Sequence, residues 1–230
     1  MAKTDSAKFQ PGATKEGPRK KILIVDDHPM MREGLRGIIS REPDLMVCGE
    51  ADCARKAMLL IEKSAPDLAL VDITLPEKNG LELVKDLKAL HPELATLVLS
   101  MHDESLYGER MLRAGAKGYI NKHQPPEELL KAIRMILDGR IYVSPEMSES
   151  VLQQFSSGSK NPRSPLQILT DREVEIFQLF GQGKTVKEIA LQLCLSDKTV
   201  AVHSANIRQK LKVKTTAKLI RLAVHSENTG

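Results

Sequence analysis

A short apolar run that ends on an aspartate constrains the fold of this chain more than any other feature. The run 68–71 (LALV) is too short to cross a membrane and is typical of a strand buried on both faces of a parallel sheet. Asp72 follows it, and after a connection containing Pro76 the apolar residues return at helical spacing, at Leu81, Val84, Leu87 and Leu90. Ligands bind at the carboxyl ends of the strands in open parallel sheets, so Asp72 occupies a candidate binding edge. Taken alone, Asp72 is equally compatible with the start of a turn.

The same strand-and-helix unit recurs along the first 139 residues. Short apolar strands are predicted at 21–25, 45–51, 68–71, 96–99 and 118–120. A helix with one apolar face is predicted after each strand, from Pro29, over 54–63, from Leu81, over 104–114 and from Pro126. This alternation predicts an α/β doubly wound five-stranded parallel sheet with right-handed crossovers.

Polar residues follow four of the predicted strands. Asp26 and Asp27 close the first strand, Asp72 the third and Ser100 the fourth, while Lys122 comes just after the fifth. Carboxylates crowded at one edge repel each other unless a cation neutralises them, and Mg²⁺ fits because it is a hard cation that prefers oxygen ligands. Asp72 is then suited to attack a phosphoryl group, with Lys122 and Ser100 binding the phosphoryl oxygens. Individually, each residue has an ordinary alternative as a solvated turn, a helix cap or a surface charge.

Two histidines, His28 and His102, lie near this edge in the sequence. Two histidines without a matched third ligand are more typical of loop residues than of a transition-metal site, so we expect Mg²⁺ with oxygen ligands.

Composition separates the chain into parts with different partners. Residues 1–20 contain no apolar block, which predicts a disordered leader rather than a secretory signal. Residues 160–230 hold twelve Lys and Arg against six Asp and Glu, a net charge of +6, whereas residues 21–159 carry −5. The basic part is expected to attract nucleic-acid phosphates. The isolated Cys48, Cys53 and Cys194 favour reduced thiols and a cytoplasmic location, and no membrane partner is expected.

The C-terminal part is predicted to be a small all-α domain over residues 166–230. It follows a linker at 143–165 that includes the Ser- and Pro-rich run 156–165. Three helix starts come in quick succession, with capping-box spacing at Thr170/Glu173 and Thr185/Glu188 and a cap at Ser196.

The third of these helices, predicted over 197–211, has two different faces. Val200, Ile207 and Leu211 form an apolar face with His203 at its margin. Small and basic residues occupy the other side: Lys198, Ala201, Val202, Ala205, Arg208 and Lys212. Such a face suits the DNA major groove, and we add Lys184 and Thr199 to the predicted DNA contacts. The alternative is a surface helix with ordinary solvated charges.

Four separated motifs in the first part resemble those of a known family. The stretches DDHPMMREGL, LVDITLPEKNGLEL, LSMHDE and AGAKGYINK resemble the receiver domain of two-component response regulators, a flavodoxin-like fold, over residues 21–139. We assign the receiver to residues 21–142. The resemblance implies that Asp72 is the phosphoacceptor and that Asp26, Asp27, Asp72 and the Thr74 carbonyl bind Mg²⁺. It also implies that Ser100 and Tyr119 are switch residues and that Lys122 pairs with the phosphate. One departure is His123, where many receivers have Pro.

The second part resembles the LuxR-type helix-turn-helix over residues 169–224, through LTDREVEIFQLFGQGKTVKEIALQLCLSDKTVAVHSANIRQKLKV. A receiver followed by this helix-turn-helix is typical of NarL/FixJ regulators. It implies a turn within 191–196, a recognition helix at 197–211 and a fourth helix at 215–224 that makes the dimer contact. Ala201 and Ala205 stand where relatives can carry long basic side chains, so we predict base readout through thymine methyl groups and DNA shape.

These observations predict a transcription regulator that a sensor histidine kinase phosphorylates and that binds double-stranded DNA as a homodimer. Two other functions use similar residues. A phosphohydrolase of the dehalogenase type would carry a second Asp two residues after the nucleophile, but that position is Thr74, so we expect no enzyme. A receiver that dimerises independently of phosphorylation is disfavoured by the intact set of acidic and basic residues.

Overall fold

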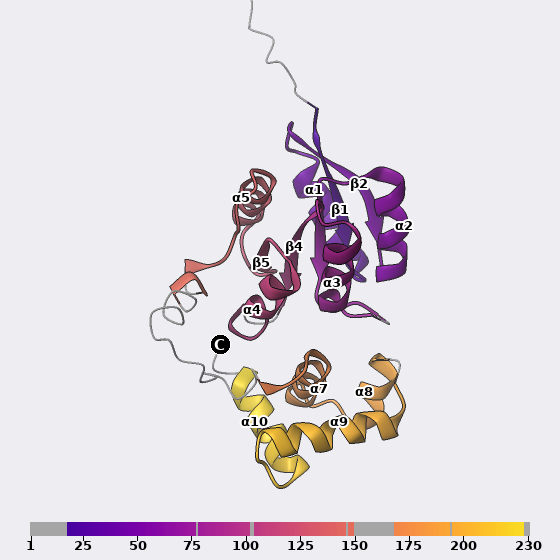
Figure 1. The fold of residues 1–230 in the computed structure, drawn as a ribbon, viewed down its shortest axis with the longest axis vertical. Coiled ribbons are helices and arrows are strands. Elements are labelled where there is room, and N and C mark those ends of the chain that lie inside the picture. Colours follow the sequence, from indigo (N-terminus) through magenta and orange to yellow (C-terminus); the bar gives the residue numbers. More distant parts are fainter. Residues whose placement is uncertain are drawn as a thin grey trace, which may run out of the picture.

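The computed structural model describes residues 18–76, 78–101, 104–145, 147–149, 168–193 and 195–227. The predicted leader up to residue 17, the run 156–165, His102 and Cys194 lie outside the described residues. Two domains are visible in Figure 1, an α/β domain followed by a helical domain.

The α/β domain is built on one parallel sheet. Its strands are β1 (Lys20–Val25), β2 (Leu45–Ala51), β3 (Leu68–Asp72), β4 (Ala95–Ser100) and β5 (Gly118–Asn121). They pair in the order β2-β1-β3-β4-β5, all in parallel. Every residue of β3 is buried, as the apolar run predicted for a central strand. The predicted five-stranded parallel sheet is confirmed.

Five helices cover this sheet: α1 (Pro29–Ile39), α2 (Ala54–Ser64), α3 (Gly80–Leu90), α4 (Glu104–Ala114) and α5 (Pro126–Leu137). Successive strand residues point to opposite faces, so the sheet has two apolar layers. Leu68 and Leu70 pack with residues of α1 and α5, whereas Ala69 and Val71 pack with residues of α2 and α3. The two layers pack on both faces of β3 and thereby position Asp72 at its end.

The helical domain contains α7 (Asp171–Gly181), α8 (Val186–Gln192), α9 (Asp197–Lys210) and α10 (Thr216–Glu227). Both predicted capping boxes form, at Thr170/Glu173 and Thr185/Glu188, and the Ser196 side chain caps α9. Phe177, Phe180, Ile189, Val200, Ile207 and Leu219 are among the residues of its core. The helix-turn-helix expectation is confirmed, with the ends of α9 and α10 shifted by one to three residues.

The end of the predicted receiver and the start of the predicted linker both pack against the α/β domain. Tyr142 forms a parallel bridge with Gly118 at the edge of the sheet, and the Tyr119 N–H donates to the Tyr142 carbonyl at 3.2 Å. Met147 is buried, and its sulfur is so close to Gly108 of α4 that a Cβ there would be 2.6 Å away.

Candidate functional site

The carboxyl edge of the sheet gathers charged groups from three strand ends. The register pairs Val25 with Val71, so Asp26 and Asp72 leave neighbouring strands side by side. Both are buried, and the Lys122 ammonium lies 2.7 Å from Asp26 Oδ2 and 2.8 Å from Asp72 Oδ2. Asp27 is adjacent and partly exposed. The sequence prediction that these strand ends converge is confirmed.

Burial and charge set the protonation of this site. Burial, together with the nearby Asp26 carboxylate, raises the pKa of Asp72 to about 6, although the Lys122 ammonium opposes the shift. For Lys122, burial by itself lowers the pKa, but the carboxylates of Asp72 and Asp26 outweigh it and raise the pKa above its ordinary value. Lys122 therefore stays cationic at neutral pH, facing a carboxylate whose ionisation is disfavoured by burial.

The same edge has the donor set for a cation. One ligand atom from each of Asp26, Asp27, His28 and Asp72 lies within 4.8 Å of the others. Asp27 Oδ1 and Asp72 Oδ2 are buried and accept no hydrogen bond from the described residues, although His28 and Lys122 are close enough for ionic contact. Buried carboxylate oxygens that accept no hydrogen bond fit Mg²⁺, a hard cation held by a few carboxylates. The Thr74 N–H donates to Asp72 Oδ1 at 3.2 Å, so Thr74 also borders the site.

A glycine that the sequence reasoning missed shapes the loop after Asp72. A Cβ on Gly80 would lie 2.1 Å from the Asp72 carbonyl oxygen, so α3 begins directly against the end of β3. The Gly80 N–H donates to the Ile73 carbonyl at 2.8 Å, and Asn79 caps α3 by accepting from the Glu82 N–H at 3.0 Å. The dipeptide Asn79-Gly80 after the strand was the available signal.

The two predicted switch residues, Ser100 and Tyr119, lie in different surroundings. Ser100 is buried at the end of β4, and its carbonyl accepts from the Lys122 N–H at 2.7 Å, which places it beside the charged edge. Tyr119 is buried near the start of β5, in an apolar cluster with Tyr107 and Met111 of α4. Ser100 therefore borders the acidic site, whereas Tyr119 lies under α4.

The predicted DNA-binding face is accessible on the helical domain. Lys184, Lys198, Ala201, Val202, Ala205 and Lys212 are exposed, and Thr199, His203 and Arg208 are half-buried. Val200 and Ile207 are buried as predicted, and Ser204, which the sequence reasoning did not place, is buried with them. In Figure 1, α7 lies between the α/β domain and α9.

Comparisons with known proteins agree with this geometry. The family described as "Response regulator receiver domain" matches residues 22–134, and "Bacterial regulatory proteins, luxR family" matches residues 167–223. The transcriptional regulatory protein DegU of Brevibacillus brevis is 35% identical, over 84% of this chain and 88% of its own length. This chain belongs to the LuxR-type two-component response regulators. It is accordingly a transcription regulator with a receiver domain and a LuxR-type DNA-binding domain.

Further relatives of this response regulator are known in sequence and structure. The transcriptional regulatory protein UhpA of Escherichia coli (strain K12) is 36% identical, over 87% of this chain and 95% of its own length. Among solved structures, RcsB from Salmonella enterica serovar Typhimurium, bound to promoter rprA in the presence of phosphomimetic BeF3-, is 25% identical. That comparison covers 88% of this chain and 97% of RcsB, with a TM-score of 0.64. None of the described helices is long and apolar enough to span a membrane.

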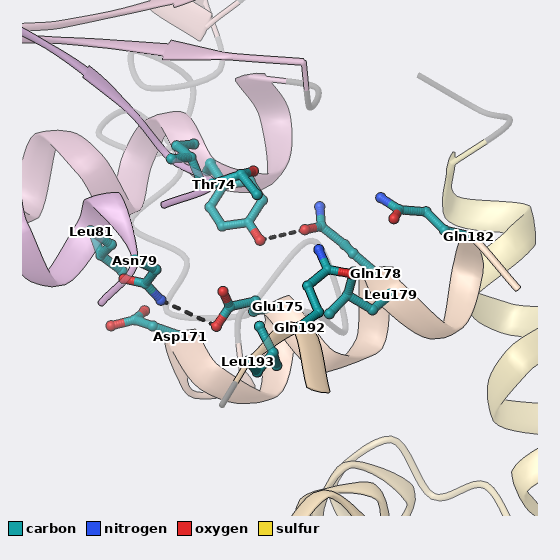
Figure 2. Close-up of a pocket in the computed structure, with 12 residues that line it drawn as sticks. Thr74, Asn79, Leu81, Asp171, Glu175, Gln178, Leu179, Gln182, Gln192 and Leu193 are labelled. Carbon is teal, nitrogen blue, oxygen red and sulfur yellow. Dashed lines mark hydrogen bonds between the residues drawn. The ribbon is translucent and has the colours of Figure 1, made fainter. Parts of the chain in front are cut away.

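The receiver of this response regulator contacts α7 of the DNA-binding domain (Figure 2). The Arg110 guanidinium of α4 lies 2.9 Å from Asp171 Oδ1 and donates to the Leu169 carbonyl at 2.8 Å. Lys85 of α3 lies 2.7 Å from Asp171 Oδ2. These contacts join two receiver helices to the start of α7.

Two further hydrogen bonds lie deeper in this interface. The Tyr107 hydroxyl donates to the Gln178 side-chain oxygen, and burial raises the pKa of that hydroxyl well above its ordinary value. The Asn79 amide donates to Glu175 at 3.3 Å (Figure 2). Ile73 and Thr74, which directly follow the phosphoacceptor candidate, line a small cavity of about 60 Å³ beside these bonds. The sequence reasoning did not find this interface, because it joins two domains and no hydrophobic period or strand direction records how their surfaces meet.

Proposed function

We propose that a sensor histidine kinase phosphorylates this response regulator on Asp72 and that phosphorylation promotes dimerisation and sequence-specific binding of double-stranded DNA. The observation that carries the proposal is the buried Asp72 at the end of β3, beside Lys122 and the carboxylates of Asp26 and Asp27. We further propose that the protein acts in the cytoplasm, as its isolated cysteines suggested.

The chemistry follows from the charges at this edge. An Asp72 carboxylate oxygen attacks the phosphorus of a phosphohistidine, and the phosphorus–nitrogen bond breaks as the phosphorus–oxygen bond forms. Lys122, kept cationic by its two carboxylate neighbours, is placed to pair with the phosphoryl oxygens. Asp26, Asp27 and Asp72, with the Thr74 carbonyl, would hold Mg²⁺, which supplies positive charge to the transferring group. Thr74 stands where a phosphohydrolase of the dehalogenase type would have its second aspartate, which supports a regulator over an enzyme.

The DNA-binding part of the proposal rests on the exposed face of α9. Lys198 and Lys212 near its two ends are suited to phosphates, while Ala201, Val202 and Ala205 present short apolar groups between them. The RcsB comparison supports this assignment, since that protein was solved bound to a promoter.

We propose that the contact with α7 couples the two events. Thr74 and Asn79 belong to the loop that leaves Asp72, and Tyr107 packs in one apolar cluster with Tyr119. A rearrangement of this loop or of Tyr119 on phosphorylation would therefore disturb the hydrogen bonds to Gln178 and Glu175. The population would shift towards chains whose DNA-binding domain is released from the receiver.

A phosphorylation assay on the full chain tests the proposal. Purified protein is incubated with Mg²⁺ and a small-molecule phosphodonor, and intact mass and binding to DNA selected from a random pool are measured. We expect a phosphoryl adduct and tighter DNA binding for the wild type, and neither for Asp72→Ala. Asp52→Ala is the matched control, because Asp52 also follows a strand but is exposed. DNA binding that is equally tight in Asp72→Ala and in the phosphorylated wild type would contradict the coupling.

A further inference from the structure

The Glu175 carboxylate of α7 lies between the receiver and the arginine that binds the end of α8. Its Oε2 atom accepts from the Asn79 side-chain amide at 3.3 Å and from the Arg172 guanidinium at 2.6 Å. We propose that Glu175 is a positioning residue for DNA binding, through which the receiver sets the orientation of α9 relative to α8. This role rests on the proposed function, because it specifies how the contact with α7 acts on the DNA-binding face.

Arg172 connects this carboxylate to the turn before α9. Its other terminal nitrogen donates to the Leu193 carbonyl at 2.9 Å, and Leu193 is the residue at which α8 ends. The last carbonyls of a helix have no partner within the helix, so an arginine that binds one of them helps to fix where the chain turns. Because α9 begins soon afterwards, at Asp197, the position of the Arg172 guanidinium bears directly on the angle between α8 and α9.

On the receiver side, Asn79 belongs to the loop that leaves Asp72, and its amide faces Glu175 across the domain contact (Figure 2). The Asn79 side-chain oxygen accepts from the Glu82 N–H at 3.0 Å, so the cap of α3 holds the amide in place. The next residue, Gly80, lies directly against the Asp72 carbonyl oxygen. A movement of the backbone after Asp72 therefore displaces the amide that binds Glu175.

Separation of the two domains uncovers nothing on the predicted DNA-binding face. Lys198, Ala201 and Ala205 of α9 are already exposed while the domains are in contact, because the receiver binds α7. In Figure 1, α7 lies between the α/β domain and α9. An effect of the receiver on DNA binding by a single chain must therefore pass through the packing of α7, α8 and α9. The bonds of Glu175 and Arg172 provide a continuous polar path in that direction.

The shared oxygen makes the two bonds of Glu175 depend on each other. One atom accepts from a neutral amide and from a charged guanidinium, and the charge-assisted bond is the shorter. When the Asn79 amide withdraws, the carboxylate is free to follow Arg172 alone, and the guanidinium can shift at the Leu193 carbonyl. Because the proposed phosphorylation tightens DNA binding, we expect the receiver contact to hold α9 away from its DNA-bound orientation.

Binding of the full chain to a DNA duplex with one half of the selected site tests this role. Fluorescence anisotropy gives the Kd before and after treatment with Mg²⁺ and a small-molecule phosphodonor, and intact mass confirms the phosphoryl adduct. We expect the wild type to bind at least about fivefold more tightly after phosphorylation. This ratio should fall close to one in Glu175→Gln, which removes the charge, and in Arg172→Lys, whose single ammonium cannot bridge Glu175 and Leu193. Arg113→Lys, the matched control at an exposed arginine of α4, should keep the wild-type ratio.

The ratio of the two Kd values distinguishes positioning from a merely structural role. A residue that only stabilises the domain changes both Kd values alike, so a wild-type ratio in the folded Glu175→Gln and Arg172→Lys proteins would overturn the role of Glu175. A wild-type ratio of one on the half-site, with tightening confined to DNA that holds two half-sites, would also overturn it, while the proposed function still stood. Absence of tightening on both DNAs would overturn this role together with the proposed coupling.

Discussion

Replacing Gly80 by alanine should damage both the stability and the chemistry of the receiver. The added Cβ would lie 2.1 Å from the Asp72 carbonyl oxygen and 2.8 Å from the Ile73 Cα, where ordinary contacts begin at 3.4 Å. The start of α3 or the end of β3 must therefore move by more than about 1 Å. Overpacking typically costs about 1–3 kcal/mol, and both neighbours are backbone atoms that no side-chain rotation can displace. We expect the free energy of unfolding to fall by about 3 kcal/mol, near the upper end of this range.

Gly34→Ala provides the control for this substitution. Gly34 lies within α1 and a Cβ there would have no neighbour within 4 Å, so alanine should stabilise the protein by about 0.5–1 kcal/mol. Urea denaturation gives the free energy of unfolding for both variants, and the phosphodonor assay gives the rate of Asp72 phosphorylation. Gly80→Ala should also slow phosphorylation, because the displaced loop carries Thr74. A Gly80→Ala protein with wild-type stability and rate would refute the close-approach argument.

Three other perturbations follow from the same structure. Folding raises the pKa of Asp72 from 3.8 to about 6, so the folded state favours the protonated carboxyl. In the absence of divalent cations, the free energy of unfolding should therefore fall by about 3 kcal/mol as the pH rises from below 4 through 6. Thermal melts across this range should show that fall in the wild type and a smaller one in Asp72→Asn. Arg110→Ala removes two contacts to the start of α7 and should strengthen DNA binding by the unphosphorylated chain several-fold, measured by fluorescence anisotropy. Arg113→Ala is the control and should leave DNA binding unchanged, because the Arg113 side chain is 76% exposed. Ala205→Lys should change the preferred site in a selection from random DNA, and an unchanged site would contradict the assignment of that face of α9.

Much of the receiver site was predictable because the relevant order is local or periodic. Short apolar runs separated by amphipathic helices require a parallel sheet, and in such a sheet all strands end at one edge. Asp26, Asp72 and Lys122 were therefore expected at one edge, and the structure brings them within 2.7–2.8 Å. The capping boxes at Thr170 and Thr185 were predictable for the same reason, since each involves residues only three positions apart.

Only the tertiary structure decided where His28 points, how closely Gly80 approaches β3 and which surface of the receiver meets α7. His28 lies in the loop before α1, as predicted, and the structure adds that its ring nitrogen lies 2.7 Å from Asp27 Oδ1. The bond between Tyr107 and Gln178 joins residues 71 positions apart, on α4 of one domain and α7 of the other. The sequence by itself determined the fold and the charged edge, because hydrophobic periodicity and strand direction suffice for them. The packing distances and the domain contact depend on how distant segments fit together, which no local pattern records.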